Sequence, residues 1–173
     1  MIEVCGENLS SSLEDYLEII FHLEEANRVA RAKDIADQMN VQRASVTGAL
    51  KALAGRGMIN YSPYNYITLT HTGRKVAQEV IRRHDILKDF FVTALQLQPD
   101  QAEANACRIE HAIESVAIDR LVQFLEFIKN CPRAGNDWLA AFSDYCQQGK
   151  RSEHCDQCVQ SCVSASTTED HPE

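Results

Sequence analysis

The chain has 173 residues, of which 45% are apolar and 24% are charged, and its formal net charge is −8. That length suffices for one domain with a substantial core or for two small domains. The composition argues against a disordered chain, and no apolar run approaches the ~18 residues that would predict a membrane span. Residues 1–12 lack a basic start followed by an apolar segment, so we expect no secretory signal and a cytoplasmic protein.

The negative net charge hides a basic segment. Residues 28–60 hold six Lys or Arg against two Asp or Glu, whereas residues 131–173 hold three against seven. A basic segment is the electrostatic footprint that duplex DNA requires, although by itself it is also typical of an ordinary solvated surface. The order of the secondary-structure elements has to decide between the two interpretations.

Residues 8–71 predict a winged helix-turn-helix DNA-binding domain. Apolar residues recur at helical spacing in three segments, and two short segments rich in aromatic and β-branched residues follow. These helices and strands are expected at residues 13–26, 31–39, 44–54, 58–61 and 66–70. Gly55 and Gly57 end the third helix, and residues 62–65 are typical of a hairpin turn.

Residues 72–130 predict a helical metal-binding and dimerisation domain. Thr70 is expected to cap a long helix over about residues 72–97, and a second long helix is expected over about residues 101–130. Both carry apolar stripes, and the core beside the wing cannot cover two of them. A homodimer interface is the economical explanation, and a self-contained helical bundle is the alternative.

The fold class that we expect is therefore mainly α: a winged helix-turn-helix, a helical dimerisation domain and a short Cys-rich C-terminal tail. The tail at residues 131–163 is expected to carry one short helix around Trp138 and Phe142. Residues 164–173 have almost nothing to bury and are predicted to be disordered.

The third helix would place its first turn in the major groove of double-stranded DNA. Arg and Gln suit bidentate readout of bases, Ser and Thr suit bases or phosphates, and a Lys further along suits a phosphate. The expected DNA contacts are Gln42, Arg43, Ser45, Thr47 and Lys51. An ordinary exposed helical face is the alternative, and the winged context favours DNA binding.

A candidate metal site draws on three predicted helices, and its members are Asp15, Glu18, His84, Cys107, Glu110 and His111. Each has an ordinary structural explanation alone, but their spacing lets neighbours on one helix share a face. Carboxylates about 4 Å apart repel by roughly 4 kcal/mol at an effective dielectric near 20, so the cluster favours a cation. Oxygen and imidazole ligands suit first-row divalent ions, and the thiolate of Cys107 favours Fe²⁺ over Mn²⁺.

The chain from residue 12 to about residue 121 resembles the iron-dependent repressor family, typified by the diphtheria toxin repressor and the manganese transport regulator. The segments that carry the resemblance are Leu-Glu-Asp-Tyr-Leu-Glu at 13–18, Asp-Ile-Ala at 34–36, Ala-Ser-Val-Thr at 44–47, Leu-Thr-His-Thr-Gly at 69–73, Arg-His at 83–84 and Ala-Cys-Arg-Ile-Glu-His at 106–111. The resemblance implies a winged-helix DNA reader, a helical dimerisation domain and a regulatory metal site between them.

The resemblance also implies a hybrid ligand set. Asp15, Glu18 and His84 match ligand positions of the manganese-responsive branch, whereas Cys107, Glu110 and His111 match the iron-responsive branch. Iron-responsive members have an ancillary metal site with a glutamate four residues after the long-helix histidine. This chain has Lys88 there, so no second site of that type is expected.

Five cysteines near the C-terminus predict a second metal site, and they are Cys131, Cys146, Cys155, Cys158 and Cys162. A C-x₂-C pair with further cysteines within reach is typical of Zn²⁺ or iron-sulfur ligands. Four thiolates would close a tetrahedral zinc site, whereas the Cys-Pro pair and the cysteine triplet suit a [4Fe–4S] cluster. Free thiols in a loose tail are the remaining alternative.

These features predict a homodimeric transcriptional repressor that controls metal homeostasis, binds a palindromic operator and uses Fe²⁺ or Mn²⁺ as corepressor. One alternative is a winged-helix regulator that senses redox or iron-sulfur status through its C-terminal cysteines. A metalloenzyme is the weaker alternative, because no separate acid, base or nucleophile accompanies the ligands, and we expect no enzymatic activity.

Overall fold

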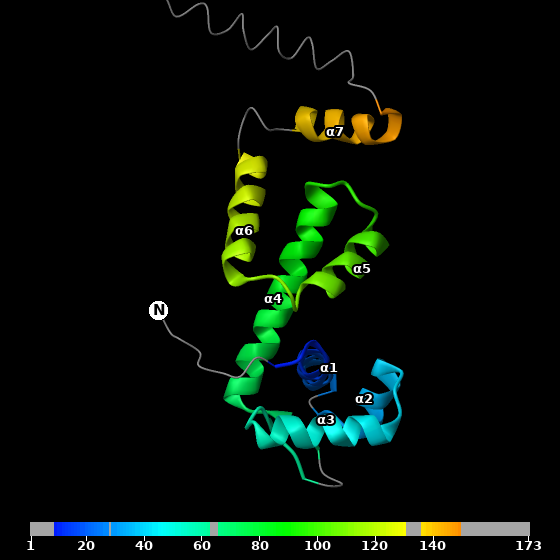
Figure 1. Cartoon of the computed structure of the whole chain (residues 1–173), viewed down its shortest axis with the longest axis vertical. Coiled ribbons are helices and arrows are strands. Elements are labelled where there is room, and N and C mark those ends of the chain that lie inside the picture. The colour runs from blue at the N-terminus through cyan, green and yellow to red at the C-terminus, as the bar shows by residue number, and fades with distance from the viewer. Residues whose placement is uncertain (1–8, 28, 63–65, 131–135, 150–173) are drawn as a thin grey trace, which may run out of the picture.

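The computed structural model describes residues 9–27, 29–62, 66–130 and 136–149. These residues form an elongated, mainly helical molecule in which a lower and an upper half are connected by one long helix (Figure 1). The elements in chain order are α1 (Ser11–Asn27), α2 (Ala32–Met39), α3 (Arg43–Gly55), β1 (Ile59–Asn60), β2 (Thr68–Leu69), α4 (His71–Thr93), α5 (Pro99–Ile109), α6 (Ser115–Asn130) and α7 (Asn136–Gln148). None of the described helices is both long and apolar enough to span a bilayer.

Helices α2 and α3 form the helix-turn-helix through a short left-handed connection. Asn40 has a φ of 52°, a conformation that Asn tolerates, and the N–H of Val41 donates to the carbonyl of Ala36 at 3.1 Å. This Schellman-type end stops α2, and α3 begins at Arg43. The tight connection between the helices predicted at residues 31–39 and 44–54 is therefore confirmed, and it spans residues 40–42.

The wing is smaller than predicted, with two residues in each strand. Strands β1 and β2 pair antiparallel, with Ile59 opposite Leu69 and Asn60 opposite Thr68. The N–H of Ile67 donates to the carbonyl of Ala30 at 2.9 Å instead of extending the ladder toward β1. The segment before α2 thus takes over pairing that the predicted five-residue strand would have used. Residues 63–65 of the expected turn lie outside the described residues.

A large core fixes the lower half. It joins α1, α2, α3 and the wing, and its completely buried large side chains include Leu17, Ile20, Ile35, Leu50, Leu53 and Ile67. Thr70 caps α4 as predicted, since its hydroxyl oxygen accepts the N–H of Gly73 at 3.1 Å. A Cβ at Gly73 would lie 1.9 Å from the carbonyl oxygen of Met58, so α4 starts in direct contact with the chain leading into the wing.

Helix α4 continues into the upper half, where α5 and α6 pack against it. A second, smaller core forms there around Leu87, Ala106 and Ile118. Because α4 belongs to both cores, it sets the position of the upper half relative to the lower half. The helix ends at Thr93, earlier than the predicted residue 97, and Gln96 follows with a φ of 56°.

The predicted single helix over residues 101–130 is wrong, because α5 ends at Ile109 and α6 starts at Ser115. Arg83 of α4 donates from Nη1 to the carbonyl of Glu110 at 2.9 Å, which occupies the acceptor that a continuous helix would need. The expected apolar stripe is broken at the same place, since Ile109 is exposed and Val116 is 69% exposed.

Candidate metal centre and DNA-binding face

Glu110 is the centre of a carboxylate–histidine cluster between the two halves. Glu110 is only 1% exposed. Its Oε2 lies 2.6 Å from Nδ1 of His84, and its Oε1 lies 3.2 Å from Nε2 of His111. Burial raises the pKa of Glu110 and outweighs the lowering effect of the hydrogen bond to His84. The turn after α5 therefore delivers a buried carboxylate with both oxygens directed at imidazole rings.

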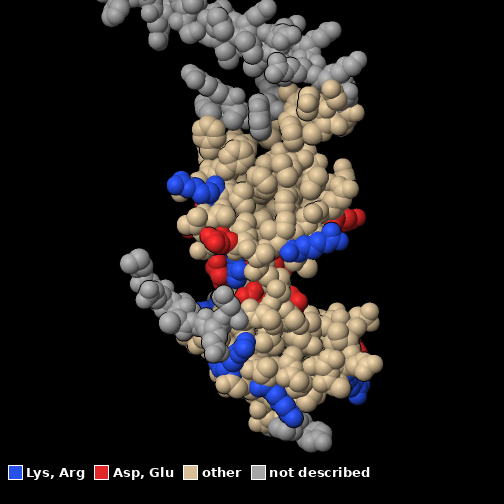
Figure 2. All heavy atoms as spheres, viewed as in Figure 1, with Lys and Arg blue, Asp and Glu red and all other residues tan. Residues whose placement is uncertain are grey.

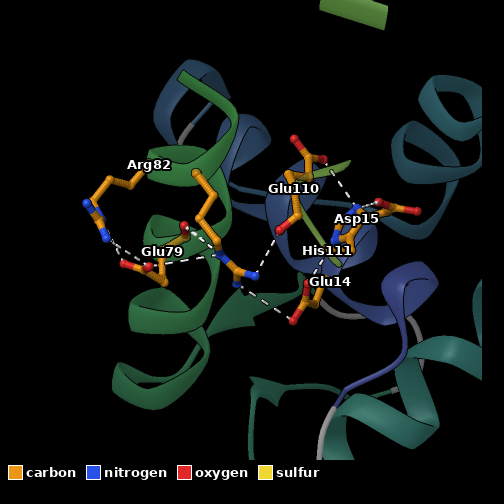
Figure 3. Close-up of polar contacts among 7 residues, drawn as sticks. Glu14, Asp15, Glu79, Arg82, Glu110 and His111 are labelled. Carbon is orange, nitrogen blue, oxygen red and sulfur yellow. Dashed lines mark hydrogen bonds and ion pairs between the residues drawn. The ribbon is translucent and has the colours of Figure 1, made fainter. Parts of the chain in front are cut away.

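His111 connects this carboxylate to helix α1. Its Nδ1 lies 2.7 Å from Oε2 of Glu14 and its Nε2 lies 2.8 Å from Oδ1 of Asp15, as Figure 3 shows. Burial alone would lower the pKa of His111, but the carboxylates of Glu14, Asp15 and Glu110 outweigh burial and raise it. Both ring nitrogens thus contact acidic groups.

Three residues of this cluster meet the distance requirement for a shared cation. Asp15, Glu110 and His111 each offer one ligand atom, and these atoms lie within 4.8 Å of one another. Two carboxylate oxygens and an imidazole nitrogen are a donor set that first-row divalent ions accept. The residues present therefore fit a divalent metal at the junction of α1 with the segment after α5.

The other three predicted ligands lie around this triad. His84 projects from α4 and contacts Glu110 directly. The charge of Glu18 contributes to raising the pKa of Glu110 and of Cys107. Oε1 of Glu18 lies 3.6 Å from Nε2 of His22. Cys107 is exposed and makes no disulfide. Partial burial of its thiol, followed by the charges of the neighbouring carboxylates, raises the pKa of Cys107, so thiolate ligation there would require a proton to leave.

Sequence reasoning missed two members of the network, Glu14 and Arg83. Glu14 lies four residues before Glu18, so helical spacing already placed both carboxylates on one face of α1. Arg83 lies within the Arg-His segment noted in the sequence, but no spacing rule links it to the distant Glu110. Its side chain is 15% exposed and its Nη2 lies 3.9 Å from Oε1 of Glu14.

The cluster occupies the narrow waist of the molecule. Figure 2 shows acidic and basic side chains side by side at this waist. On α4, Arg82 contacts Glu79 (Figure 3), with Nε of Arg82 lying 3.0 Å from Oε2 of Glu79. Nε of Arg83 donates to the carbonyl of Glu79 at 3.3 Å. Charged side chains at the waist therefore come from α1, from α4 and from the turn after α5.

Four of the predicted DNA contacts lie at the N-cap or in the N-terminal half of α3, and Lys51 lies in its C-terminal half. Gln42 is its N-cap residue and makes no side-chain capping bond, while Arg43, Ser45 and Lys51 are exposed. Thr47 differs, because its hydroxyl donates to the carbonyl of Arg43 at 3.0 Å. Its hydrogen is thus used within the helix, and only its oxygen lone pairs remain for a donor on DNA.

A further basic side chain lies beside the wing. The guanidinium carbon of Arg31 lies 5.2 Å from the centre of the Tyr66 ring, and Nη2 donates to the Tyr66 hydroxyl at 3.4 Å. The hydrogen bond to Tyr66 raises the pKa of Arg31. Sequence reasoning did not select this pair, because the contact joins residues 35 positions apart.

The predicted Cys-rich site falls largely outside the described residues. Cys131, Cys155, Cys158 and Cys162 lie there, and only Cys146 is described, exposed on α7 and without a disulfide. Nothing in the described part of the chain supports an iron-sulfur cluster. A zinc site or an iron-sulfur cluster formed by these cysteines stays a prediction.

A winged helix-turn-helix joined to a helical domain, with a carboxylate–histidine cluster between them, defines a metal-responsive DNA-binding protein. Residues 8–67 match the N-terminal DNA-binding domain of iron-dependent repressors, and residues 70–139 match their metal-binding and dimerisation domain. The chain belongs to the iron-dependent repressor family, a family of metal-binding transcriptional regulators and not of enzymes.

Individual relatives agree with this membership. The chain is 37% identical over 123 residues to an uncharacterised HTH-type transcriptional regulator of Methanocaldococcus jannaschii, covering 70% of this chain and 98% of that protein. It is 32% identical to the HTH-type transcriptional regulator MntR of Listeria monocytogenes, covering 71% of this chain and 86% of the relative.

Solved structures give the same result. The manganese regulator SloR superposes with a TM-score of 0.60 at 30% identity, covering 71% of this chain and 57% of the SloR chain. A manganese-dependent transcriptional repressor in complex with manganese superposes with a TM-score of 0.58 at 26% identity, covering 72% of this chain and 59% of the other. The chain thus spans less than two thirds of these longer proteins.

Proposed function

We propose that this protein is a homodimeric repressor of metal-homeostasis genes whose affinity for a palindromic operator depends on Fe²⁺ or Mn²⁺. The observation that carries the proposal is the placement of Asp15, from the DNA-binding half, within 4.8 Å of Glu110 and His111. A regulatory ion needs ligands from both halves in order to change their arrangement. A reader of duplex DNA works beside the chromosome, so we place its action in the cytoplasm.

The proposed ligands are the six residues identified in the sequence, Asp15, Glu18, His84, Cys107, Glu110 and His111. When bound, a divalent ion would offset part of the negative charge of these groups and hold α1 to α4 and to the end of α5. Asp15 and Glu18 contribute from the DNA-binding half, and the other ligands contribute from the dimerisation half. Glu14 lies at Nδ1 of His111, which leaves Nε2 facing Asp15 and Glu110.

Coupling between this centre and DNA follows from dimer geometry. The recognition helices of a dimer read two half-sites about one helical turn apart, so affinity depends on the distance between them. Gln42, Arg43, Ser45, Thr47 and Lys51 are the proposed DNA contacts on α3. Fixing α1 against α4 and α5 in each protomer would fix that distance, and metal and operator would strengthen each other's binding.

The donor set supports Fe²⁺ first and Mn²⁺ second. Carboxylates and imidazoles accept either ion, whereas a thiolate from Cys107 would favour the softer Fe²⁺. By comparison, SloR is a manganese regulator and the second solved structure is a manganese-dependent repressor. Cys107 is therefore the residue that tests the choice between the two ions. A Cys107→Glu variant should shift the preference toward Mn²⁺.

The decisive experiment measures operator binding with and without metal under anaerobic conditions. An operator is first selected from random duplex DNA with Fe²⁺-loaded protein, and affinities are then measured for the wild type, Glu110→Ala and His111→Ala. Metal should raise wild-type affinity by about 5- to 150-fold and should have no effect on either variant. The matched control is Asp119→Asn, which removes an exposed carboxylate of α6 outside the cluster. A wild-type metal response retained in Glu110→Ala and His111→Ala would overturn the ligand assignment.

A further inference from the structure

Three charged or ionisable side chains, His84, Glu103 and Lys88, form a row beside the carboxylate–histidine cluster. Oε1 of Glu103, on α5, lies 3.2 Å from Nε2 of His84, and Oε2 of the same carboxylate lies 2.7 Å from Nζ of Lys88. His84 and Lys88 are one helical turn apart on α4, so Glu103 reaches both from the neighbouring helix. Neither Glu103 nor Lys88 belongs to the proposed ligand set.

The two nitrogens of His84 face different groups. Nδ1 lies 2.6 Å from Glu110, inside the cluster, whereas Nε2 faces Glu103 on the outer side. Metal-binding histidines commonly donate their second N–H to a carboxylate, which fixes the tautomer and the orientation of the ring. Glu103 occupies that position relative to His84.

Lys88 restricts the orientation of the Glu103 carboxylate. The Glu103 side chain is 52% exposed, so an unrestrained carboxylate there would sample many rotamers. The ammonium of Lys88 holds one oxygen on the outer side of α4 and leaves the other for His84. The same pairing keeps Glu103 from turning inward to become a ligand.

We propose that Glu103, held by Lys88, is a positioning residue that keeps the proton of His84 on Nε2 and presents Nδ1 to the metal centre. The proposal rests on the proposed function only in taking His84 as a ligand. It assigns Lys88 and Glu103 to tuning of the regulatory site instead of to surface stability.

The chain contains a matched control for this pair. Nζ of Lys129, on α6, lies 2.9 Å from Oδ2 of Asp89 on α4, with exposure similar to that of the Lys88–Glu103 pair. That second ion pair also connects α4 to a neighbouring helix, and within the described residues its hydrogen bonds and ion pairs involve no histidine. An effect of ion-pair loss alone should therefore appear equally in Asp89→Asn and in Glu103 variants.

The test compares Glu103→Ala, Glu103→Gln, Lys88→Met and Asp89→Asn by two measurements. The first is Mn²⁺ affinity by calorimetry. The second is the ¹⁵N chemical shifts of the His84 ring in the metal-free protein, at a pH where the ring is neutral. Glu103→Ala should weaken Mn²⁺ binding by about 10-fold and reduce the Nε2–H tautomer. Glu103→Gln should keep most of both, because its amide oxygen still accepts, and Asp89→Asn should match the wild type.

Lys88→Met should fall between the wild type and Glu103→Ala in both measurements. Wild-type affinity and tautomer in Glu103→Ala would reduce the pair to a surface salt bridge and overturn the proposal. His84→Ala is measured alongside by calorimetry, and a loss of Mn²⁺ affinity in Glu103→Ala as large as in His84→Ala would make Glu103 a ligand and would overturn the proposal as well. If the wild type binds neither Mn²⁺ nor, under anaerobic conditions, Fe²⁺, the proposed function fails, whereas the tautomer measurement still decides the role of Glu103.

Discussion

Individual side chains at the waist both shape the fold and serve as candidate metal ligands. Glu110 is buried, ends one helix and contacts two histidines that come from different elements. The local pair Glu110–His111 was predictable, because adjacent donors after a helical cysteine stand out in the sequence. The contact with His84 was not predictable in the same way, because it depends on how α4 and α5 pack.

Gly73 is the residue where packing leaves least room. An added Cβ would overlap the carbonyl of Met58, which the backbone cannot easily move. We expect Gly73→Ala to lower the free energy of unfolding by about 1–3 kcal/mol. Gly48→Ala is the control, since a Cβ there meets nothing within 4 Å and alanine favours the helix. Urea denaturation of both variants checks this, and equal stabilities would contradict the contact between α4 and the wing.

The elements divide into those that sequence determines locally and those that tertiary contacts determine. Helix periodicity, the cap at Thr70 and the left-handed Asn40 are local, and the helix-turn-helix was accordingly predicted within a few residues. The break between α5 and α6 depends on Arg83 reaching the carbonyl of Glu110, 27 positions away. The short wing likewise depends on Ile67 pairing with Ala30. Neither contact has a periodic signature.

Within α3, the two kinds of DNA contact should separate experimentally. Arg43→Ala should cost about 1–3 kcal/mol of operator affinity and relax specificity at one base position, because the proposed bidentate base contact would be lost. Lys51→Ala should weaken specific and non-specific DNA similarly and reduce the salt slope by about 1. Binding titrations at several salt concentrations check both, and identical behaviour of the two variants would refute the division of roles.

The ion pair between α4 and α6 gives a pH dependence. Burial alone would raise the pKa of Asp89, but bonds from Lys129 and Thr93 outweigh it and lower that pKa. When folding lowers the pKa of a carboxyl group, its charged form stabilises the folded protein at pH values above the unfolded pKa of ~3.9. This contribution disappears as the pH falls through the folded pKa. Because both side chains are about half exposed, Asp89→Asn should cost less than about 1 kcal/mol at pH 7.

The measurement is denaturant unfolding of metal-free wild type and Asp89→Asn between pH 7 and pH 2. The difference in unfolding free energy should shrink toward acid pH. A difference that grows as pH falls would have the wrong sign for a carboxylate stabilised by Lys129.

At the scale of the whole molecule, α6 presents apolar side chains that remain exposed in the described part of the chain. Val116, Phe124 and Phe127 are all exposed on this helix, in a region that matches a dimerisation domain. We expect them to contribute to the dimer interface, since exposed aromatic residues gain most from burial. Phe127→Asp should therefore shift the protein toward monomer in sedimentation experiments. Val41→Asp, an exposed apolar site near α3, is the control and should remain dimeric.

Helix α4 runs unbroken from the wing, past His84, into the upper half. A helix rises about 1.5 Å per residue, so roughly 15 Å separates Arg74 from His84. A tilt of about 10° around the waist would displace the wing end by nearly 3 Å, close to the ~3.4 Å spacing of bases along a DNA strand. Because α4 belongs to both cores, even a small tilt between the two halves would displace the DNA-binding half by a distance comparable to the spacing of bases.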